Sequence, residues 1–472
     1  MGILNPRMTR RTFAGLSAAV VARAVVGGEP AAPAVPSPAP GAAGTAASGE
    51  PAAWTSAASV PVNTQVSVDA FAAHIEPSLA VNHRDPRNLL AACRVFQDSL
   101  IGLATYVSFD AGLTWHGNGL LPGVVPDFDG NASVAFDENG RGYVCAIQAA
   151  TAQPRHGDAY VWRTDDGGRS FSSPVTAITA GAGVADHPSL VISQHPVAST
   201  PRLYIAARMF NTGNDGIVLA RSLDGGRTFG QPLLLAAPTA TQVATLPVAA
   251  IGPDGTLCVI YVLVDTSNGA AALKAAASTD GGESFAEPAS LASAISLSPD
   301  LGDVTIESGA WVAASPYEPR FYAVMTAFDD NTATSSLLLA ASTDGARTWN
   351  PPITLATSNQ TVYLQPQAAV DARGRVAVSV YALSIAAAKI DVMLYLSESG
   401  GTVFGPPQRV TTQSFDPRQA INTGSTRWLG NYQALAASRD VFHPMWTDTR
   451  TGDAELFTAT IPTGRAKARY VS

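Results

Sequence analysis

Charged residues and cysteines are scarce in this chain of 472 residues. Only 14% of its residues are Asp, Glu, Lys or Arg, whereas 46% are hydrophobic, and this balance excludes an intrinsically disordered chain. The formal net charge of -8 makes nucleic acid a poor partner. The three cysteines, Cys93, Cys145 and Cys258, cannot all pair, and none has C-x-x-C spacing. A disulfide framework or a zinc ribbon is therefore not expected.

Long apolar runs are also missing. Beyond residue 60 no segment approaches the roughly 20 apolar residues of a membrane helix, so no span is expected in the mature protein. The 41 glycines and 33 prolines predict many turns and few long helices. At about 150 residues per domain the length favours three domains, unless the chain grows by repetition.

The N-terminal residues have the composition of a targeting segment and a linker. Arg10-Arg11 precedes a mostly apolar run, and residues 1–28 resemble a twin-arginine export signal. An ordinary secretory signal or a chance basic N-terminus is the alternative. Residues 29–60 are almost all Ala, Pro, Gly, Ser and Thr and predict a disordered linker. We expect a secreted protein with one domain over residues 61–463 and a tail over 464–472.

One octapeptide recurs along the chain with the consensus S-x-D-x-G-x-[ST]-[WF]. Five good copies begin at Ser108, Thr164, Ser222, Ser278 and Ser342, and a sixth, at Ser397, has Ser399 in place of Asp. In each copy the Asp can accept hydrogen bonds from backbone N–H groups that follow it, the Gly can adopt a positive φ, and the last aromatic ring can be buried. The octapeptide predicts a hairpin turn held together by these contacts, so its Asp residues are expected to be structural.

A second pattern precedes every copy. It consists of an apolar strand, a polar turn and another apolar strand, as in Pro77–Val81 with Asn88–Ala92. Further copies begin near Ala132, His187, Leu246, Gly309, Leu364 and Asn431, and only the last has no octapeptide after it. The repeat predicts an all-β, seven-bladed β-propeller of four-stranded antiparallel blades, with the octapeptide between third and fourth strands. Val62–Val68 can supply the missing outer strand of the last blade. Six blades are the alternative.

The octapeptide resembles the Asp-box, or BNR repeat, of the sialidase superfamily. The phrases around Pro77–Asn82, Gly430–Tyr432 and Trp446–Arg450 are similar to those of secreted bacterial sialidase-like propellers. The resemblance implies a carbohydrate-active propeller, although fold does not fix function. Sialidases carry a Phe/Tyr-Arg-Ile-Pro motif in the first blade. Here the comparable segment, His74-Ile75-Glu76-Pro77, has Glu in place of Arg, so a classical sialidase is not expected.

Strand direction predicts that the face opposite the octapeptides carries the chemistry. Residues just before first strands and just after second strands gather there, and they include carboxylates, arginines and aromatic rings, which suit acid/base work, anion pairing and sugar stacking. Glu76, Asn131, Gln365 and Asn431 belong to this polar set. The candidate catalytic residues are Asp186, His187, Glu307, Tyr432, Asp129 and Asp448. The candidate substrate-binding residues are Arg94, Arg208, Arg427, Trp428, Trp446 and Arg450.

Each candidate also has a structural interpretation. Asp186-His187-Pro188 could cap a turn, Glu307 could be a solvated loop residue, and Tyr432 could belong to the core. Trp446-Thr-Asp448-Thr-Arg450 could be a turn whose Asp–Arg pair locks the last blade, and Arg208 and Arg427 could bridge blades. Asp127 and Asp129 could bind calcium, but a lone D-x-D is weak support, so no cofactor is expected.

Three function classes remain open from the sequence. The first is a secreted, sialidase-like glycoside hydrolase acting on an acidic or complex glycan. In it an acid/base carboxylate (Asp186, Asp129 or Asp448) works with Glu307 or Tyr432, and Arg208, Arg427 and Arg450 clamp a substrate carboxylate. The second is a non-catalytic propeller of the cell envelope that binds a glycan or a protein. The third is a polysaccharide lyase using His187 and a Tyr. A glycan partner and a monomer are expected.

Overall fold

The structure, a computed structural model, describes residues 60–97, 100–123, 129–150, 156–193, 200–210, 215–297, 301–329, 331–423 and 426–463. Within these ranges the fold is all-β, and the helical content is one 3-10 turn, η1 (Pro417–Gln419). None of the described elements is a helix long and apolar enough to cross a membrane.

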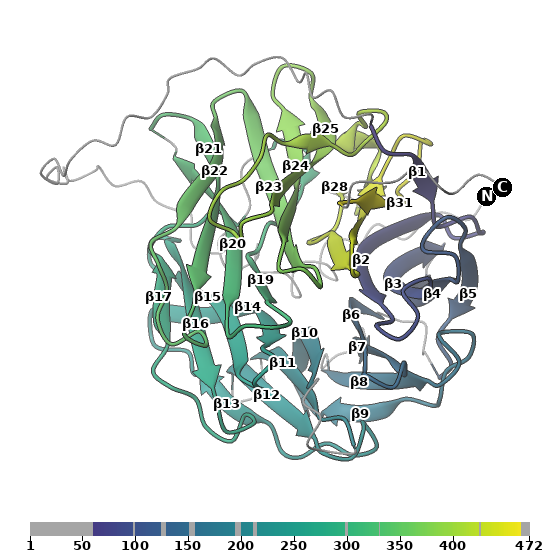
Figure 1. The fold of residues 1–472 in the computed structure, drawn as a ribbon, viewed down its shortest axis with the longest axis vertical. Helices are drawn as coiled ribbons and strands as arrows, with labels where there is room; N and C mark the ends of the chain where they lie inside the picture. Colours follow the sequence, from purple (N-terminus) through teal and green to yellow (C-terminus); the bar gives the residue numbers. More distant parts are fainter. Residues whose placement is uncertain are drawn as a thin grey trace, which may run out of the picture.

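The strands form antiparallel units around a common centre, and we number these units by their order in the chain (Figure 1). Unit 1 is β2 (Ala73–Val81), β3 (Leu89–Gln97), β4 (Leu100–Ser108) and β5 (His116–Leu120); unit 2 is β6 (Asp129–Phe136), β7 (Gly142–Ala150), β8 (His156–Thr164) and β9 (Val175–Ile178). Unit 3 is β10 (Val184–Ile192), β11 (Leu203–Phe210), β12 (Gly216–Ser222) and β13 (Leu233–Ala236); unit 4 is β14 (Gln242–Ile251), β15 (Leu257–Asp265), β16 (Ala271–Ser278) and β17 (Ala289–Ala292).

The remaining units follow the same order from the centre outward. Unit 5 is β19 (Trp311–Ala314), β20 (Phe321–Asp329), β21 (Thr334–Ser342) and β22 (Ile353–Ser358); unit 6 is β23 (Thr361–Val370), β24 (Val376–Ser384), β25 (Lys389–Ser397) and β26 (Gln408–Arg409). Unit 7 is β29 (Ala434–Ala437), β30 (Val441–Asp448), β31 (Glu455–Ala459) and β1 (Asn63–Gln65), with β32 (Ile461–Pro462) also paired to β30.

The last unit contains strands from both ends of the described chain. β1 pairs antiparallel with β31, with Asn63 opposite Ala459 and Gln65 opposite Phe457. The sequence had suggested that Val62–Val68 would complete this unit, and the observed pairing agrees. The N-terminal segment therefore occupies an edge that would otherwise be open.

The hydrophobic core consists of layers between neighbouring units. One cluster joins Leu90 of unit 1 to Trp162 of unit 2, and another joins Leu79 of unit 1 to Met445 of unit 7. Similar clusters join the other neighbouring pairs of units. Because the apolar side chains pack between sheets, the centre of the molecule is left to the inner strand of each unit.

The octapeptides form one hydrogen-bonded turn in every good copy. In the third copy the carboxylate of Asp224 accepts from the backbone N–H of Thr228 at 2.9 Å and from its hydroxyl at 2.6 Å, while Ser222 donates to the same carboxylate at 2.8 Å. The closing ring of this copy, Phe229, packs against the core between units 2 and 3. Because these carboxylates are committed to the turn, they are not available for catalysis.

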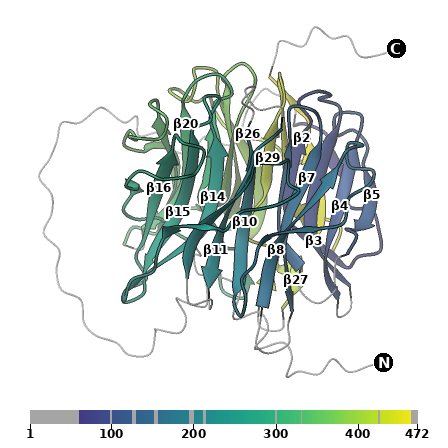
Figure 2. The ribbon, with the colours of Figure 1, turned by 90° about the horizontal axis from the view of Figure 1, so that it is seen from below.

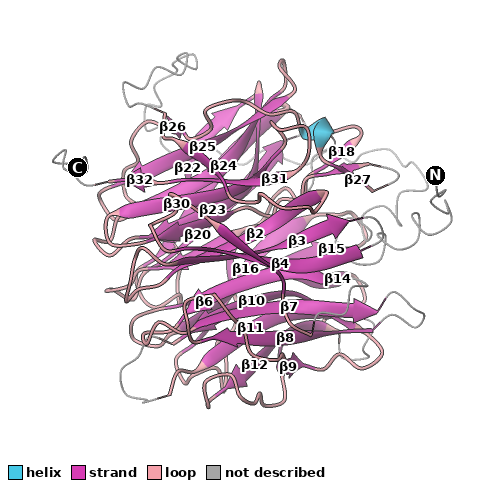
Figure 3. Ribbon diagram, turned by 90° about the vertical axis from the view of Figure 1, so that its right-hand side faces the viewer, coloured by secondary structure: helices cyan, strands magenta, loops and turns pink. Residues whose placement is uncertain are grey.

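A small three-stranded sheet links segments that are distant in the sequence. β18 (Val304–Thr305) runs parallel to β28 (Arg427–Trp428), which pairs antiparallel with β27 (Ile421–Asn422). Figure 2 shows β27 at the lower edge of the molecule, and Figure 3 shows β18 and β27 together at one side. The segments that lead into units 5 and 7 are thereby held together.

Candidate functional site

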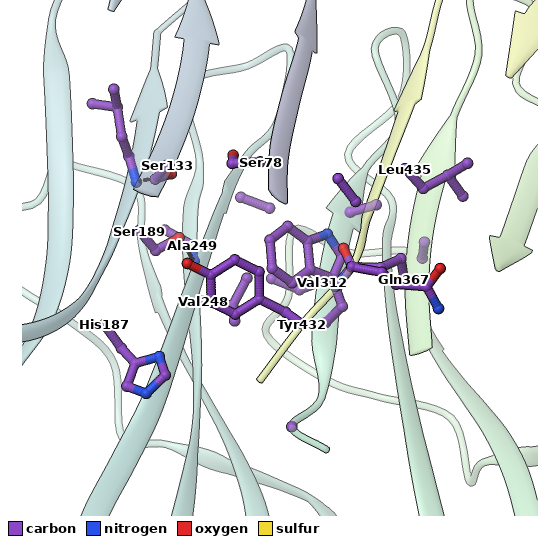
Figure 4. A pocket seen from close by; sticks show the side chains of 18 of the residues that line it. Ser78, Ser133, His187, Ser189, Val248, Ala249, Val312, Gln367, Tyr432 and Leu435 are labelled. Atoms are coloured by element: carbon purple, nitrogen blue, oxygen red, sulfur yellow. Dashed lines mark hydrogen bonds between the residues drawn. The ribbon is translucent and has the colours of Figure 1, made fainter. Parts of the chain in front are cut away.

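A cavity of about 380 Å³ lies at the centre, where the inner strands of all units meet. Its wall includes Asn131 of unit 2, His187 of unit 3, Gln365 of unit 6 and Tyr432 just before β29. Glu307, which lies between β18 and β19, also lines it. Figure 4 shows Tyr432 extending toward the side of the cavity where His187 lies.

The same backbone irregularity recurs on the inner strands. Glu76, Asn131, His187, Leu246 and Gln365 have φ between 49° and 58°, and the ladder of each strand shifts register at or next to that residue. Four of the five precede a proline, a position that disfavours most non-extended conformations. Each costs on the order of 1–3 kcal/mol, so the packed units must hold these bulges in place. At each bulge the side chains no longer alternate regularly between the two faces of the strand.

A chain of buried polar groups connects units 1, 2 and 3 beside the cavity. Glu76 forms an ion pair of 3.0 Å with Arg94, and Arg94 donates a hydrogen bond of 2.8 Å to Asn131. Asn131 in turn donates to Asp186 at 3.1 Å. The second oxygen of Asp186 lies 3.9 Å from Nε2 of His187, which is longer than a hydrogen bond. These contacts fix the side-chain positions behind His187.

Glu76 places a carboxylate inside the protein beside the cavity. Its side chain is fully buried, and burial raises its pKa, an effect that the nearby Arg94 and His187 oppose. The guanidinium of Arg94 also lies over the ring of Trp428, 5.2 Å from its centre. The side chain of Arg94 is therefore held by contacts within the protein.

His187 and Tyr432 face each other inside the cavity. Their ring centres are 6.5 Å apart in an edge-to-face arrangement. Burial raises the pKa of Tyr432 well above its ordinary value of 10, and the negative charge of Glu76 adds to this. Tyr432 therefore keeps its proton at neutral pH and can act as a donor.

Three of the candidates, all in unit 7, are joined by hydrogen bonds. Asp448 is fully buried and accepts hydrogen bonds from Trp446 at 2.8 Å and from the Arg450 side chain at 2.5 Å. Arg450 also donates to Asn63 at 3.0 Å, which ties β1 to this unit. None of Trp446, Asp448 and Arg450 lines the cavity, and their contacts correspond to the structural interpretation of this motif.

The other arginine candidates lie away from the cavity wall. Arg208 is opposite Asp186 in the ladder, donates a long hydrogen bond of 3.3 Å to Thr245, and lies over Phe210. Arg427, in β28, donates to the backbone oxygen of Ala420 at 3.3 Å. The three arginines expected to clamp a carboxylate, Arg208, Arg427 and Arg450, are thus not brought together at the cavity.

Two further candidates belong to neighbouring elements. The indole N–H of Trp428 donates to the side chain of Asn431 at 3.0 Å, so Trp428 supports the segment before β29. Asp129 begins β6 opposite Gln148, but its side chain lies outside the described atoms, and Asp127 lies outside the described residues.

Within the described part of the chain no group of three or more His, Cys, Asp and Glu could hold a metal ion.

Sequence reasoning missed several residues of the cavity wall, namely Trp311, Gln367 and Gln433. Gln367 and Gln433 stand two positions after Gln365 and Asn431. In units 1 to 3 the corresponding position is serine, and Ser78, Ser133 and Ser189 each accept a backbone N–H of the next unit at 2.9–3.0 Å (Figure 4). Aligning the inner strands on Glu76-Pro-Ser, His187-Pro-Ser and Gln365-Pro-Gln would have revealed this position.

No family model matches the chain, and neither does any curated protein. Solved structures resemble it at the level of fold. A Hadza microbial sialidase, Hz136, is 13% identical with a TM-score of 0.45, covering 79% of this chain and 76% of its own. The leech intramolecular trans-sialidase is 12% identical with a TM-score of 0.46, covering 76% and 70%. The α-l-arabinofuranosidase Arb93A of Fusarium graminearum is 11% identical with a TM-score of 0.45, covering 85% and 98%.

Proposed function

We propose that the protein is a secreted carbohydrate-active enzyme of the sialidase-like kind, which cleaves glycosidic bonds of a complex glycan in the central cavity. One observation carries the proposal: Glu307, His187 and Tyr432 line one cavity of about 380 Å³, a size suited to a sugar residue or two. Carboxylate, imidazole and phenol are groups that perform proton transfer in enzymes.

We propose a seven-bladed propeller built on Asp-box turns as the scaffold. The order of the four-stranded units, the clusters between them and the pairing of β1 with β31 support this architecture. We further propose that residues 1–28 direct export, that 29–60 form a linker, that 61–463 form the domain, and that 464–472 form a tail. The composition of these segments supports the division.

In the proposed reaction Glu307 and His187 exchange protons with the leaving group and the attacking water. Glu307 lies in the segment that leads into unit 5 and His187 lies in unit 3, with unit 4 between them, so the two groups reach the cavity from different parts of its wall. Tyr432 holds its proton and donates a hydrogen bond to the substrate, rather than serving as a nucleophile. Asn131 and the Glu76–Arg94 pair hold the Asp186 carboxylate, which lies 3.9 Å from Nε2 of His187.

A lyase is the second candidate, because His187 and Tyr432 face each other at 6.5 Å and could act as base and acid. Elimination from a uronate also needs a positive group to neutralise the carboxylate. No described residue of the cavity wall is Arg or Lys, which favours hydrolysis.

An assay on a panel of sialylated, arabinose-containing, uronate-containing and neutral glycans tests the proposal. Hydrolysis gives new reducing ends, whereas elimination gives unsaturated sugars that absorb ultraviolet light. We expect Glu307→Gln to reduce turnover by about 100-fold or more, and Asp448→Asn, outside the cavity, to alter stability rather than the chemical step. Glycan retention without any product, in wild type and variants alike, would instead indicate a binding propeller.

A further inference from the structure

One wall of the central cavity contains three glutamines whose carbonyl oxygens have no hydrogen-bond donor in the described part of the chain. Gln365 and Gln367 come from β23, and Gln433 directly precedes β29. All three line the cavity, and each side chain is at most 2% exposed. Buried acceptors without a donor are rare in folded proteins, and each costs about 1–3 kcal/mol unless something satisfies it.

Two of these amides have a fixed orientation. The Nε2 group of Gln365 donates to the backbone oxygen of Gly430 at 2.7 Å, and that of Gln433 donates to the backbone oxygen of Gln365 at 2.8 Å. A backbone carbonyl can only accept, so neither amide can be turned over without placing two oxygens together. In both side chains the oxygen is therefore the atom left for another partner.

The other described side chains of the cavity wall also carry little positive charge. Glu307 adds a carboxylate to the wall, and Arg and Lys are absent from that part of the lining which the structure describes. The rings of Trp311 and Tyr432 line the same cavity and offer apolar faces. A wall of acceptors and a carboxylate attracts groups that donate hydrogen bonds and repels a second carboxylate.

We propose that this wall is a subsite for donor groups, either the hydroxyls of an uncharged sugar or the ammonium of an amino sugar, and that it discriminates against sugar acids. Water satisfies such oxygens in the free protein, and a hydroxyl placed at the same position replaces it at little cost. The inference rests on the proposed function in that it names the substrate class of the same cavity.

Three probes test the inference on the full-length protein. Methyl glucoside and methyl glucuronide differ only in the group at C6, so they compare a hydroxyl with a carboxylate. Glucosamine carries an ammonium in place of the C2 hydroxyl, and glucose is its matched comparison because both have a free anomeric hydroxyl. We expect calorimetry or saturation-transfer NMR to show methyl glucoside or glucosamine binding at least about tenfold more tightly than methyl glucuronide. Glucoside binding identifies hydroxyls as the source of the donors, and glucosamine binding identifies the ammonium.

Gln367→Met provides the matched variant, because the Gln367 amide makes no hydrogen bond within the described part of the chain, unlike the amides of Gln365 and Gln433. We expect it to weaken binding of the preferred probe about tenfold, while Gln408→Met, on the outer strand β26, leaves binding unchanged. Equal or tighter binding of methyl glucuronide, or no binding of any probe, would overturn the inference.

The two proposals fail in different ways. Binding of the uncharged probe without cleavage of any glycan would support the donor subsite and refute the enzyme. Cleavage of a sialylated or uronate-containing glycan at a rate that Gln367→Met does not change would support the enzyme and refute the donor subsite.

Discussion

His74 is the residue whose perturbation we expect to be most informative about stability. Its ring is fully buried, with Nε2 3.1 Å from Asp69 and Nδ1 2.9 Å from Glu455. Burial alone would lower its pKa, but the two carboxylates overcome this and raise the pKa from 6.5 to about 9. The ion pairs connect the segment before β2, β2 itself and β31, so the protonated ring joins segments near the two ends of the described chain.

The magnitude follows from the two pKa values. Because folding raises the pKa, the stabilisation is complete below pH 6.5 and is lost as the pH rises to about 9. A rise from 6.5 to about 9 corresponds to about 3 kcal/mol. We expect His74→Gln to be less stable than wild type by about this amount at pH 6, and the difference to shrink toward zero at pH 9.5.

Denaturant unfolding followed by tryptophan fluorescence measures this difference at each pH. His443 is the control: it is also buried, but burial lowers its pKa to about 4, so the folded protein keeps it neutral throughout the range. The difference between wild type and His443→Gln should be constant from about pH 7.5 to 9.5. Below that it should change in the opposite direction to that of His74→Gln, because only the unfolded His443 takes up a proton near pH 6.5. A stability difference for His74→Gln that is independent of pH, or an NMR titration of His74 near 6.5, would refute the reasoning.

Three further predictions concern other parts of the molecule. Gly130→Ala places a Cβ 1.8 Å from the guanidinium of Arg94, so it should displace Arg94 from Glu76 and cost about 3 kcal/mol in a denaturation experiment. Gly119→Ala, with open space around its Cβ, is the steric control, although its positive φ adds a small cost. Asp166→Ala should cost about 1 kcal/mol at pH 7, because water screens this exposed turn carboxylate. Partial burial raises the pKa of Asp166, but its hydrogen bonds lower it to about 2, so the cost should disappear as the pH falls from about 4 to 2. Tyr432→Phe should reduce turnover about 100-fold with little change in thermal stability, and an unchanged rate would exclude its role as a donor.

The turns and strand order follow from local sequence, which is why they could be predicted. In the octapeptide the Asp, the hydroxyl residue and their backbone partners lie within four residues of one another, as in Asp224 and Thr228. The strand β1 was also predictable, because the last unit lacked a fourth strand and only the start of the domain alternates suitably. Both inferences depend on spacing along the chain rather than on contacts in space.

The role of individual polar residues could not be predicted in the same way. Glu307 precedes a first strand and Asp448 ends a second strand, and both were expected on the same face, yet Glu307 lines the cavity whereas Asp448 is enclosed by Trp446 and Arg450. The difference arises from partners that lie across a unit and from the bulges of the inner strands, which change the direction of a side chain. Sequence alone also leaves the partner of Glu76 unknown, since Arg94 stands eighteen residues later on the neighbouring strand.

The pairing of β1 with β31 has a consequence for biosynthesis. The last unit cannot be assembled before residues near 459 have left the ribosome, because its outer strand was made almost 400 residues earlier. Contacts at such separation make folding slow, and fragments that stop short would present an unpaired strand edge. We therefore expect C-terminal truncations that end between residue 405 and β31 to aggregate during synthesis, even though they retain every octapeptide turn.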